Sequence, residues 1–209
     1  MKLGVALCAS ALSAHVGCAL FSKSDAFVSR YFSPESVAPP AARVAPSGLE
    51  LRLGRVGSAA YIKDEIVFRD SSYEVGFYDG RRWTEKPEFY VRRALTRALF
   101  DRRGIRQIAY GVGTTLDVDV LAFEEVRAPA HVGRVQLDYS LVDHRVVLFS
   151  RSVTVERPIA DAAGDAAADA IVAALARALV DSVDILADQT AEELRTEGSM
   201  PVSNSPGSP

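Results

Sequence analysis

The chain has 209 residues, and 48% of them are hydrophobic, which is enough for one domain with a sizeable core. Its formal net charge is −3 and its isoelectric point is about 5.7, so it lacks the basic surplus that general nucleic-acid binding requires. Both cysteines, Cys8 and Cys18, lie near the amino terminus, which excludes a disulfide or a cysteine-based metal site from the rest of the chain.

Residues 1–18 have the pattern of a secretory signal. Lys2 precedes an apolar run that ends near Ala14 and is shorter than the roughly 20 apolar residues of a membrane span. The small residue directly before Cys18 resembles a bacterial lipobox, although His15 stands where Leu is usual. We therefore expect Cys18 to be lipidated. The alternative is an ordinary signal peptide that is cut elsewhere, such as after Ala14.

Residues 19–48 hold four prolines among Ser and Ala and show no periodicity. We predict a flexible tether here, with a brief extended piece at residues 27–32. Ala19, and not Asp, would be the second residue of the lipidated chain. By the sorting rule of bacterial lipoproteins, this favours the periplasmic side of the outer membrane.

The next segments read as strands. Residues 49–56 alternate between Leu and charged side chains, which is typical of a half-buried strand. Residues 65–69 and 73–78 are β-branched and aromatic runs on either side of a turn cluster of Asp and Ser, so we predict strand, turn and strand. We expect Asp79-Gly80 to close the second of these strands.

Residues 84–103 then change to helical spacing, with Thr84 as the expected cap, Pro87 in the first turn and Gly104 as the stop. One face is apolar and the opposite face is basic. The apolar positions are Val91, Leu95, Ala98 and Leu99, and the basic positions are Arg92, Arg93 and Arg97.

Two surfaces of this region are candidates for a ligand or a partner. Trp83, the only Trp, lies with Tyr78 and Phe89 at the joint between hairpin and helix, and the other interpretation of these aromatic residues is core packing. The face formed by Arg92, Arg93 and Arg97 is either a solvated surface or a contact for acidic lipid head groups or a partner helix.

Three long strands and a final helix complete the pattern. Residues 114–126, 132–142 and 146–155 alternate, and a tight turn at 143–145 joins the last two into an antiparallel hairpin. An Ala-rich helix begins within residues 161–169 and carries an apolar stripe at Val172, Leu175, Leu179, Val183 and Leu186.

We predict an α+β fold in which a single mostly antiparallel β-sheet carries both helices on one face. The predicted divisions are a lipoprotein signal peptide at 1–18, a tether at 19–48, the folded domain at 49–197 and a disordered tail at 198–209.

The central stretch also carries a family resemblance. Tyr-Glu-Val-Gly-Phe-Tyr-Asp at 73–79 leads to Arg82-Trp83-Thr84-Glu85-Lys86-Pro87 and then to a helix with repeated Ala-Leu pairs. This order resembles the auxiliary lipoproteins of ABC-type transport systems, including the paraquat-inducible protein C group. The resemblance covers roughly residues 49–186.

The resemblance implies a non-enzymatic lipoprotein that works with an ABC permease and ATPase and with a substrate-binding protein bearing an MCE (mammalian cell entry) domain. Such systems are linked to lipid movement between the inner and outer membranes. We expect no cofactor. Two alternatives stay open, namely a stand-alone periplasmic lipid-binding carrier and an envelope assembly lipoprotein that recruits a partner by strand addition at a sheet edge.

The residues offer little for catalysis. Beyond the signal region the only histidines are His131 and His144, which fall in a predicted loop and a predicted turn, and no hydrolase, zinc-protease or phosphate-loop motif is present. Asp117, Asp119 and Asp138 could form a row across neighbouring strands. Since like charges directly opposite destabilise a sheet, we expect that row to be staggered and solvated rather than a metal site.

Overall fold

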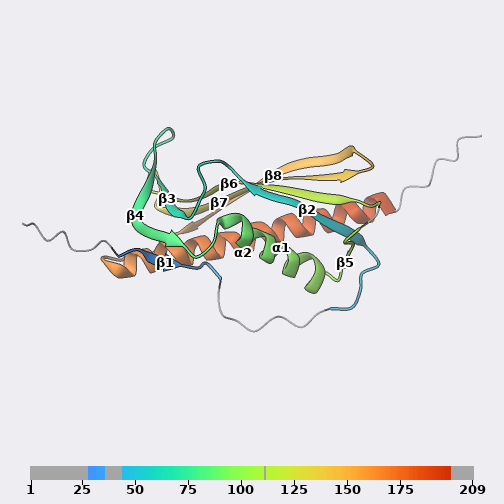
Figure 1. The fold of residues 1–209 in the computed structure, drawn as a ribbon, viewed down its shortest axis with the longest axis horizontal. Helices are drawn as coiled ribbons and strands as arrows, with labels where there is room; N and C mark the ends of the chain where they lie inside the picture. Colours follow the sequence, from blue (N-terminus) through green and yellow to red (C-terminus); the bar gives the residue numbers. More distant parts are fainter. Residues whose placement is uncertain (1–27, 36–43, 111, 199–209) are drawn as a thin grey trace, which may run out of the picture.

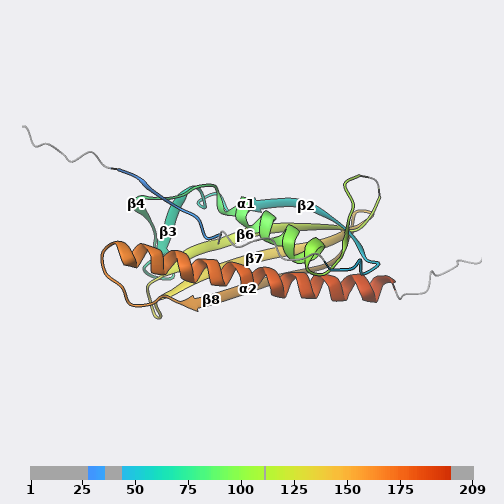
Figure 2. The ribbon, with the colours of Figure 1, turned by 90° about the horizontal axis from the view of Figure 1, so that it is seen from below.

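In the part of the chain that the structure describes, the alternating segments pair into one eight-stranded sheet, and both amphipathic segments pack on the same face of it (Figures 1 and 2). The structure is a computed structural model that describes residues 28–35, 44–110 and 112–198. The predicted signal peptide, the lipidation site Cys18 and residues 199–209 of the predicted tail lie outside these ranges, so those predictions stay predictions. The predicted α+β class, mostly antiparallel with both helices on one face, is confirmed.

The three longest strands form an antiparallel meander. They are β6 (Thr115–Val126), β7 (Val132–Asp143) and β8 (Val146–Pro158). The predicted tight turn between β7 and β8 is present. His144 and Arg145 there have φ angles of 44° and 72°, the left-handed pair that a two-residue hairpin turn requires.

The other edge of β6 is shared by two parallel partners. Strand β2 (Glu50–Ser58) pairs with its first half and β3 (Glu65–Arg69) with its second half. The short β5 (Arg106–Gln107) extends the sheet beyond β2. The alternation of 49–56 therefore predicted a strand correctly, whereas its parallel pairing follows only from the tertiary arrangement.

Strand β4 (Val75–Trp83) differs from the prediction, because Asp79-Gly80 does not close it. Its pairing with β3 shifts register between Glu65 opposite Arg82 and Val67 opposite Phe77, which leaves residues 78–81 as a wide bulge. Gly80 takes a φ of 67° in that bulge, a conformation that glycine adopts without strain. The strand thus bends and continues, where the sequence signal suggested an end.

The first helix also begins later than predicted. Helix α1 (Pro87–Thr96) continues into a π-helical turn, η1 (Arg97–Asp101), and its cap is Lys86 rather than Thr84. Pro87 occupies the first turn as expected. Gly104 ends the segment with a φ of 63°, and a side chain there would collide with the carbonyl of Ala45. The predicted inner residues Val91, Leu95, Ala98 and Leu99 are all fully buried.

The second helix, α2 (Asp165–Gly198), is the main cover of β7 and β8. Its predicted apolar stripe is buried at Leu175, Leu179, Val183 and Leu186, with Val172 half-buried. At 34 residues it is about 50 Å long, yet no helix in the described part of the chain is long and apolar enough to cross a membrane.

We predict that the close approach of α2 to the sheet depends on Gly133. A Cβ atom at this position would lie 3.0 Å from the backbone nitrogen of Leu175. Gly133→Val should therefore lower the free energy of unfolding by about 1–3 kcal/mol in urea titrations. Ser140→Val, on the uncovered face of the same strand, should change it by no more than about 0.5 kcal/mol. Equal effects of the two substitutions would contradict this account.

Candidate functional site

A short strand from the expected tether attaches the amino-terminal segment to the domain. Strand β1 (Arg30–Phe32) runs parallel to the end of β4, with Phe32 opposite Trp83. The Thr84 amide donates a hydrogen bond to the Phe32 carbonyl at 2.9 Å. The extended piece predicted within 27–32 is confirmed for these three residues, and the folded region includes residues that we expected in the tether.

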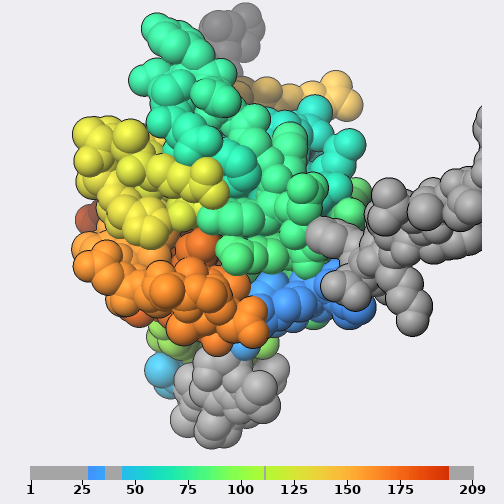
Figure 3. All heavy atoms as spheres, turned by 90° about the vertical axis from the view of Figure 1, so that its left-hand side faces the viewer, coloured from blue at the N-terminus to red at the C-terminus, as the bar shows by residue number. Residues whose placement is uncertain are grey.

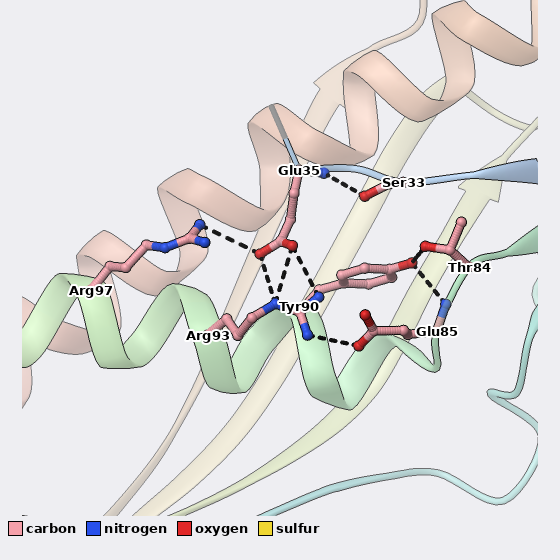
Figure 4. A network of polar contacts seen from close by, with 7 residues as sticks. All are labelled: Ser33, Glu35, Thr84, Glu85, Tyr90, Arg93 and Arg97. Atoms are coloured by element: carbon pink, nitrogen blue, oxygen red, sulfur yellow. Dashed lines mark hydrogen bonds and ion pairs between the residues drawn. The ribbon is translucent and has the colours of Figure 1, made fainter. Parts of the chain in front are cut away.

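Glu35, three residues after β1, is bound by two arginines of the first helix and η1 (Figure 4). Its carboxylate accepts hydrogen bonds from Arg93 Nη2 at 2.9 Å and Arg93 Nε at 3.1 Å, and a longer one from Arg97 Nη1 at 3.4 Å. Arg93 also donates to Glu85 at 2.6 Å. Hydrogen bonds to Glu35 first, and then to Glu85, raise the pKa of the Arg93 guanidinium, which therefore stays charged.

Tyr90 joins this group, which we call the N-terminal latch and define as Glu35, Glu85, Tyr90, Arg93 and Arg97. The Tyr90 hydroxyl accepts from the Glu85 amide at 3.0 Å and hydrogen-bonds the Thr84 hydroxyl at 2.8 Å (Figure 4). This contact explains why Thr84 is not the helix cap. The latch fixes β1, the end of β4 and the start of α1 to one another.

Trp83 is not on a surface. It is 1% exposed and packs edge-to-face against Tyr90 and Phe123, with ring centroids 6.2 and 5.3 Å away. The prediction that Trp83 contributes to a ligand or partner surface is therefore wrong, and the other interpretation, core packing, is correct for this residue. Phe89, which we grouped with it, points outward and is 48% exposed. A buried indole gains more from aromatic contacts than it would gain at the rim of the domain.

Tyr78 lies in a different polar group, at the far end of β6. Its hydroxyl donates to buried Glu125 at 2.5 Å and accepts from Arg127 at 2.9 Å. His131 Nε2 lies 2.6 Å from the other Glu125 oxygen, so this loop histidine has a defined partner. Burial, and next the hydrogen bond to Glu125, raises the pKa of the Tyr78 hydroxyl.

The neighbouring Glu124 is equally buried but faces the opposite side of the sheet. It binds Arg69 at 2.8 Å and lies 3.6 Å from Arg134. A shift of register in β6 between Val120 and Ala122 interrupts the strict alternation, and both acids are enclosed beyond it. Two consecutive buried glutamates each need a cationic or hydroxyl partner, and each has one.

The three candidate arginines are separated as well. Arg92 donates to the Gly54 carbonyl at 2.7 Å and ties α1 to β2, while Arg93 and Arg97 bind Glu35. Of the five residues predicted for the partner or ligand surface, the structure therefore brings only Arg93 and Arg97 into direct contact with a shared partner. Sequence reasoning missed that partner, although Glu35 is the only acidic residue between Asp25 and Glu50.

The aspartate row is arranged differently from the prediction. Asp119 and Asp138 lie directly opposite each other in the β6–β7 pairing instead of being staggered. Arg55 on β2 offsets the repulsion between these two carboxylates, because its guanidinium donates hydrogen bonds to both Asp119 oxygens at 2.6 and 2.5 Å. Within the described residues, no group of three or more His, Cys, Asp or Glu side chains is arranged to hold a metal ion.

The amino-terminal strand gathers with three other segments at one end of the molecule. Figure 3 shows β1 in blue, the β3–β4 region in green, the β6–β7 connection in yellow and the start of α2 in orange on this end. Arg30 contacts Asp165 at the start of α2, which links the amino-terminal strand to the long helix.

Comparisons with known proteins agree with this fold. A crystal structure of a Xanthomonas campestris protein, XCC0632, is 23% identical with a TM-score of 0.64, and the match covers 77% of this chain and 97% of that one. A second crystal structure, of an uncharacterised protein, is 15% identical with a TM-score of 0.57, over 78% and 99% of the two chains. At these identities the likeness establishes the fold alone. A comparison with curated protein sequences found no match.

The family itself is established by sequence. The family of ABC-type transport auxiliary lipoprotein components matches residues 33–187, well over half of the chain. The chain therefore belongs to this family, as the resemblance in its central stretch suggested. The match begins at Ser33, within the segment that the N-terminal latch holds to the domain.

We predict that the latch holds the amino-terminal segment. Glu35→Gln should lower the free energy of unfolding by about 1 kcal/mol, since a partly exposed ion pair contributes no more, and should speed hydrogen exchange at the Thr84 amide. Glu88→Gln is the matched control, because Glu88 lies in the first turn of the same helix and outside the latch. Unchanged exchange in Glu35→Gln would show that the strand holds without the latch.

A second prediction concerns alkaline pH. The raised pKa of Tyr78 means that the folded state favours the neutral hydroxyl. The stability from this group is complete below its ordinary pKa of about 10 and is lost as the pH rises through the higher folded pKa. Tyr78→Phe should be less stable at pH 7 by about 1–3 kcal/mol, because Glu125 loses a donor, and should lose less stability above pH 10 than the parent. Parallel alkaline curves in urea titrations would contradict this assignment.

Proposed function

We propose that this protein is a non-enzymatic, lipid-anchored auxiliary component of an ABC-type transport system that moves lipids or other hydrophobic molecules across a bacterial envelope. Its anchor would be Cys18, and its place the periplasmic side of the outer membrane. Its partners would be an MCE-domain substrate-binding protein and the permease and ATPase of the same system. Family membership supports the transport role, and the finer assignments are the proposal.

The observation that carries this proposal is the attachment of the amino-terminal strand. Only ten positions separate Cys18 from Val28, the first residue of the described segment. Even fully extended, that stretch spans about 35 Å. A lipidated Cys18 would therefore hold the β1 end of the domain close to the bilayer, whereas a free tether of residues 19–48 would let the domain move much farther away.

The internal pairing of the charged groups is one basis for proposing a non-enzymatic role. Arg93, Arg97, Glu124 and Glu125 each contact a partner within the domain, which stabilises the structure. An active site instead requires titratable groups that converge on a substrate position. The energy for transport would come from the ATPase partner.

A second candidate function rests on strand β8. Among the strands of the described residues, this 13-residue strand pairs with β7 alone, which leaves its other edge without a partner there. An exposed edge can accept an added strand from another protein, as an envelope assembly lipoprotein would use it. The two functions differ in the protein that is recovered with the chain.

We predict that Cys18→Ser releases the protein from membranes into the soluble periplasmic fraction, while Cys8→Ser leaves it in the membrane fraction. Cell fractionation followed by immunoblotting makes the measurement. Sedimentation of Cys18→Ser with the membranes would contradict the anchor.

The partner is tested on native protein purified from detergent-solubilised envelopes. Mass spectrometry should recover an MCE-domain protein with it and find acyl chains on Cys18. Recovery of an outer-membrane assembly protein instead, lost when β8 is altered, would favour the second candidate.

A further inference from the structure

A small pocket lies on the sheet beside the N-terminal half of β3, apart from the latch and from both helices. It has a volume of about 170 Å³ and is lined by Tyr61, Lys63, Glu65 and Phe77. Tyr61 and Lys63 come from the loop between β2 and β3, Glu65 begins β3, and Phe77 lies on β4. Neither the latch nor the family resemblance assigns these residues a role.

The two aromatic walls of the pocket differ in their polar contacts and in their exposure. The Tyr61 hydroxyl donates to the Leu121 carbonyl at 2.7 Å, which fixes this ring against β6. Burial, and then the charge of Glu124, raises the pKa of Tyr61, so its hydroxyl stays neutral at physiological pH. Phe77 lies opposite buried Val67 in the β3–β4 pairing and is itself 46% exposed. One ring is held in place, and the other offers its surface to a ligand.

Charges of opposite sign complete the pocket. Lys63 is exposed, and Glu65 is half-buried. Among the described residues, Glu65 has a 3.3 Å contact to Arg82, whose shorter contact is to Asp64 at 2.8 Å. Since an ionised carboxylate has about four acceptor positions, Glu65 can still accept from a ligand. The pocket thus combines one ammonium group, one carboxylate and two aromatic rings.

We propose that this pocket binds the head group of a zwitterionic phospholipid, namely a phosphate diester that carries a primary ammonium, as in phosphatidylethanolamine. Lys63 would contact the phosphate, and Glu65 would accept from the ammonium. The faces of Tyr61 and Phe77 would attract the same cation. This inference rests on the proposed lipid-transport function and names the lipid chemistry that the domain would recognise.

The size of the pocket supports a head group over an acyl chain. Sites that enclose drug-sized ligands usually have roughly 300–1,000 Å³, and this pocket is smaller. An acyl chain also has no group for Lys63 or Glu65 to bind. The lipid tails would therefore remain outside the pocket, in the bilayer or with a partner.

Isothermal titration calorimetry on the full chain in a non-ionic maltoside detergent tests the proposal. The probes are dihexanoyl-phosphatidylethanolamine, dihexanoyl-phosphatidylglycerol, which lacks the ammonium, and glycerophosphoethanolamine, which lacks the tails. We expect the ethanolamine lipid to bind at least about tenfold more tightly than the glycerol lipid, because one charge-assisted contact is lost in the latter.

Two variants with matched controls locate the site. Phe77→Ala should weaken binding of the ethanolamine lipid by about fivefold and Glu65→Gln by about tenfold. Phe89→Ala and Glu88→Gln are the matched controls and should leave the affinity for the ethanolamine lipid unchanged, because both residues lie on α1, away from the pocket. Phe89 is 48% exposed, which is similar to the exposure of Phe77. Circular dichroism and urea titrations establish that each variant is folded.

Several outcomes would overturn the proposal. Equal affinity for the two lipids would exclude recognition of the ammonium, and equal effects of Phe77→Ala and Phe89→Ala would exclude this pocket. Binding of glycerophosphoethanolamine but not of the lipid would identify a soluble phosphate ester as the ligand. None of these failures bears on whether an MCE-domain protein is recovered with the chain. Membrane attachment that persists in Cys18→Ser would refute the anchor of the proposed function and would leave the pocket proposal standing.

Discussion

The pairing of β6 along both of its edges is the constraint on which the rest of this structure depends. One edge holds β7 over eleven residue pairs, and the other is divided between β2 and β3. The shift of register after Val120 marks the boundary between those two partners. Because both edges of β6 are paired, Glu124 and Glu125 near its end are buried. The hydrogen bonds from Arg69 and Tyr78 offset the free-energy cost of burying these two carboxylates.

The same compensation applies at the amino-terminal end of the domain. Within the described residues, strand β1 has three paired residues, too few to hold an edge strand by backbone hydrogen bonds alone. Glu35 adds a multiply hydrogen-bonded ion pair to Arg93, and Phe32 adds contact with the core beside Trp83. Among the residues that the structure describes, the segment nearest the proposed anchor is thus part of the folded domain. A force applied through the anchor would act first on β1 and then on Glu35 of the latch.

Much of the fold could be predicted because hydrophobic periodicity is a local property. The alternation in β6 and β7 and the apolar stripe of α2 identified their buried faces, and the glycine at 104 identified the end of the first helical segment. The errors arose where tertiary contacts override local signals. Asp79-Gly80 forms a bulge instead of an end, and Thr84 bonds the Tyr90 hydroxyl instead of capping a helix.

The sequence by itself determined the fold class, the strand and helix faces, and the family, because periodicity and a short run of specific residues carry them. Only the tertiary structure decided what the candidate site residues do. Trp83 is buried, Arg92 binds a backbone carbonyl, and Arg93 binds Glu35, which lies 58 positions away in the chain. The partner of a charged side chain such as Arg93 is set by how distant segments pack, and the spacing of residues along one helix does not identify that partner.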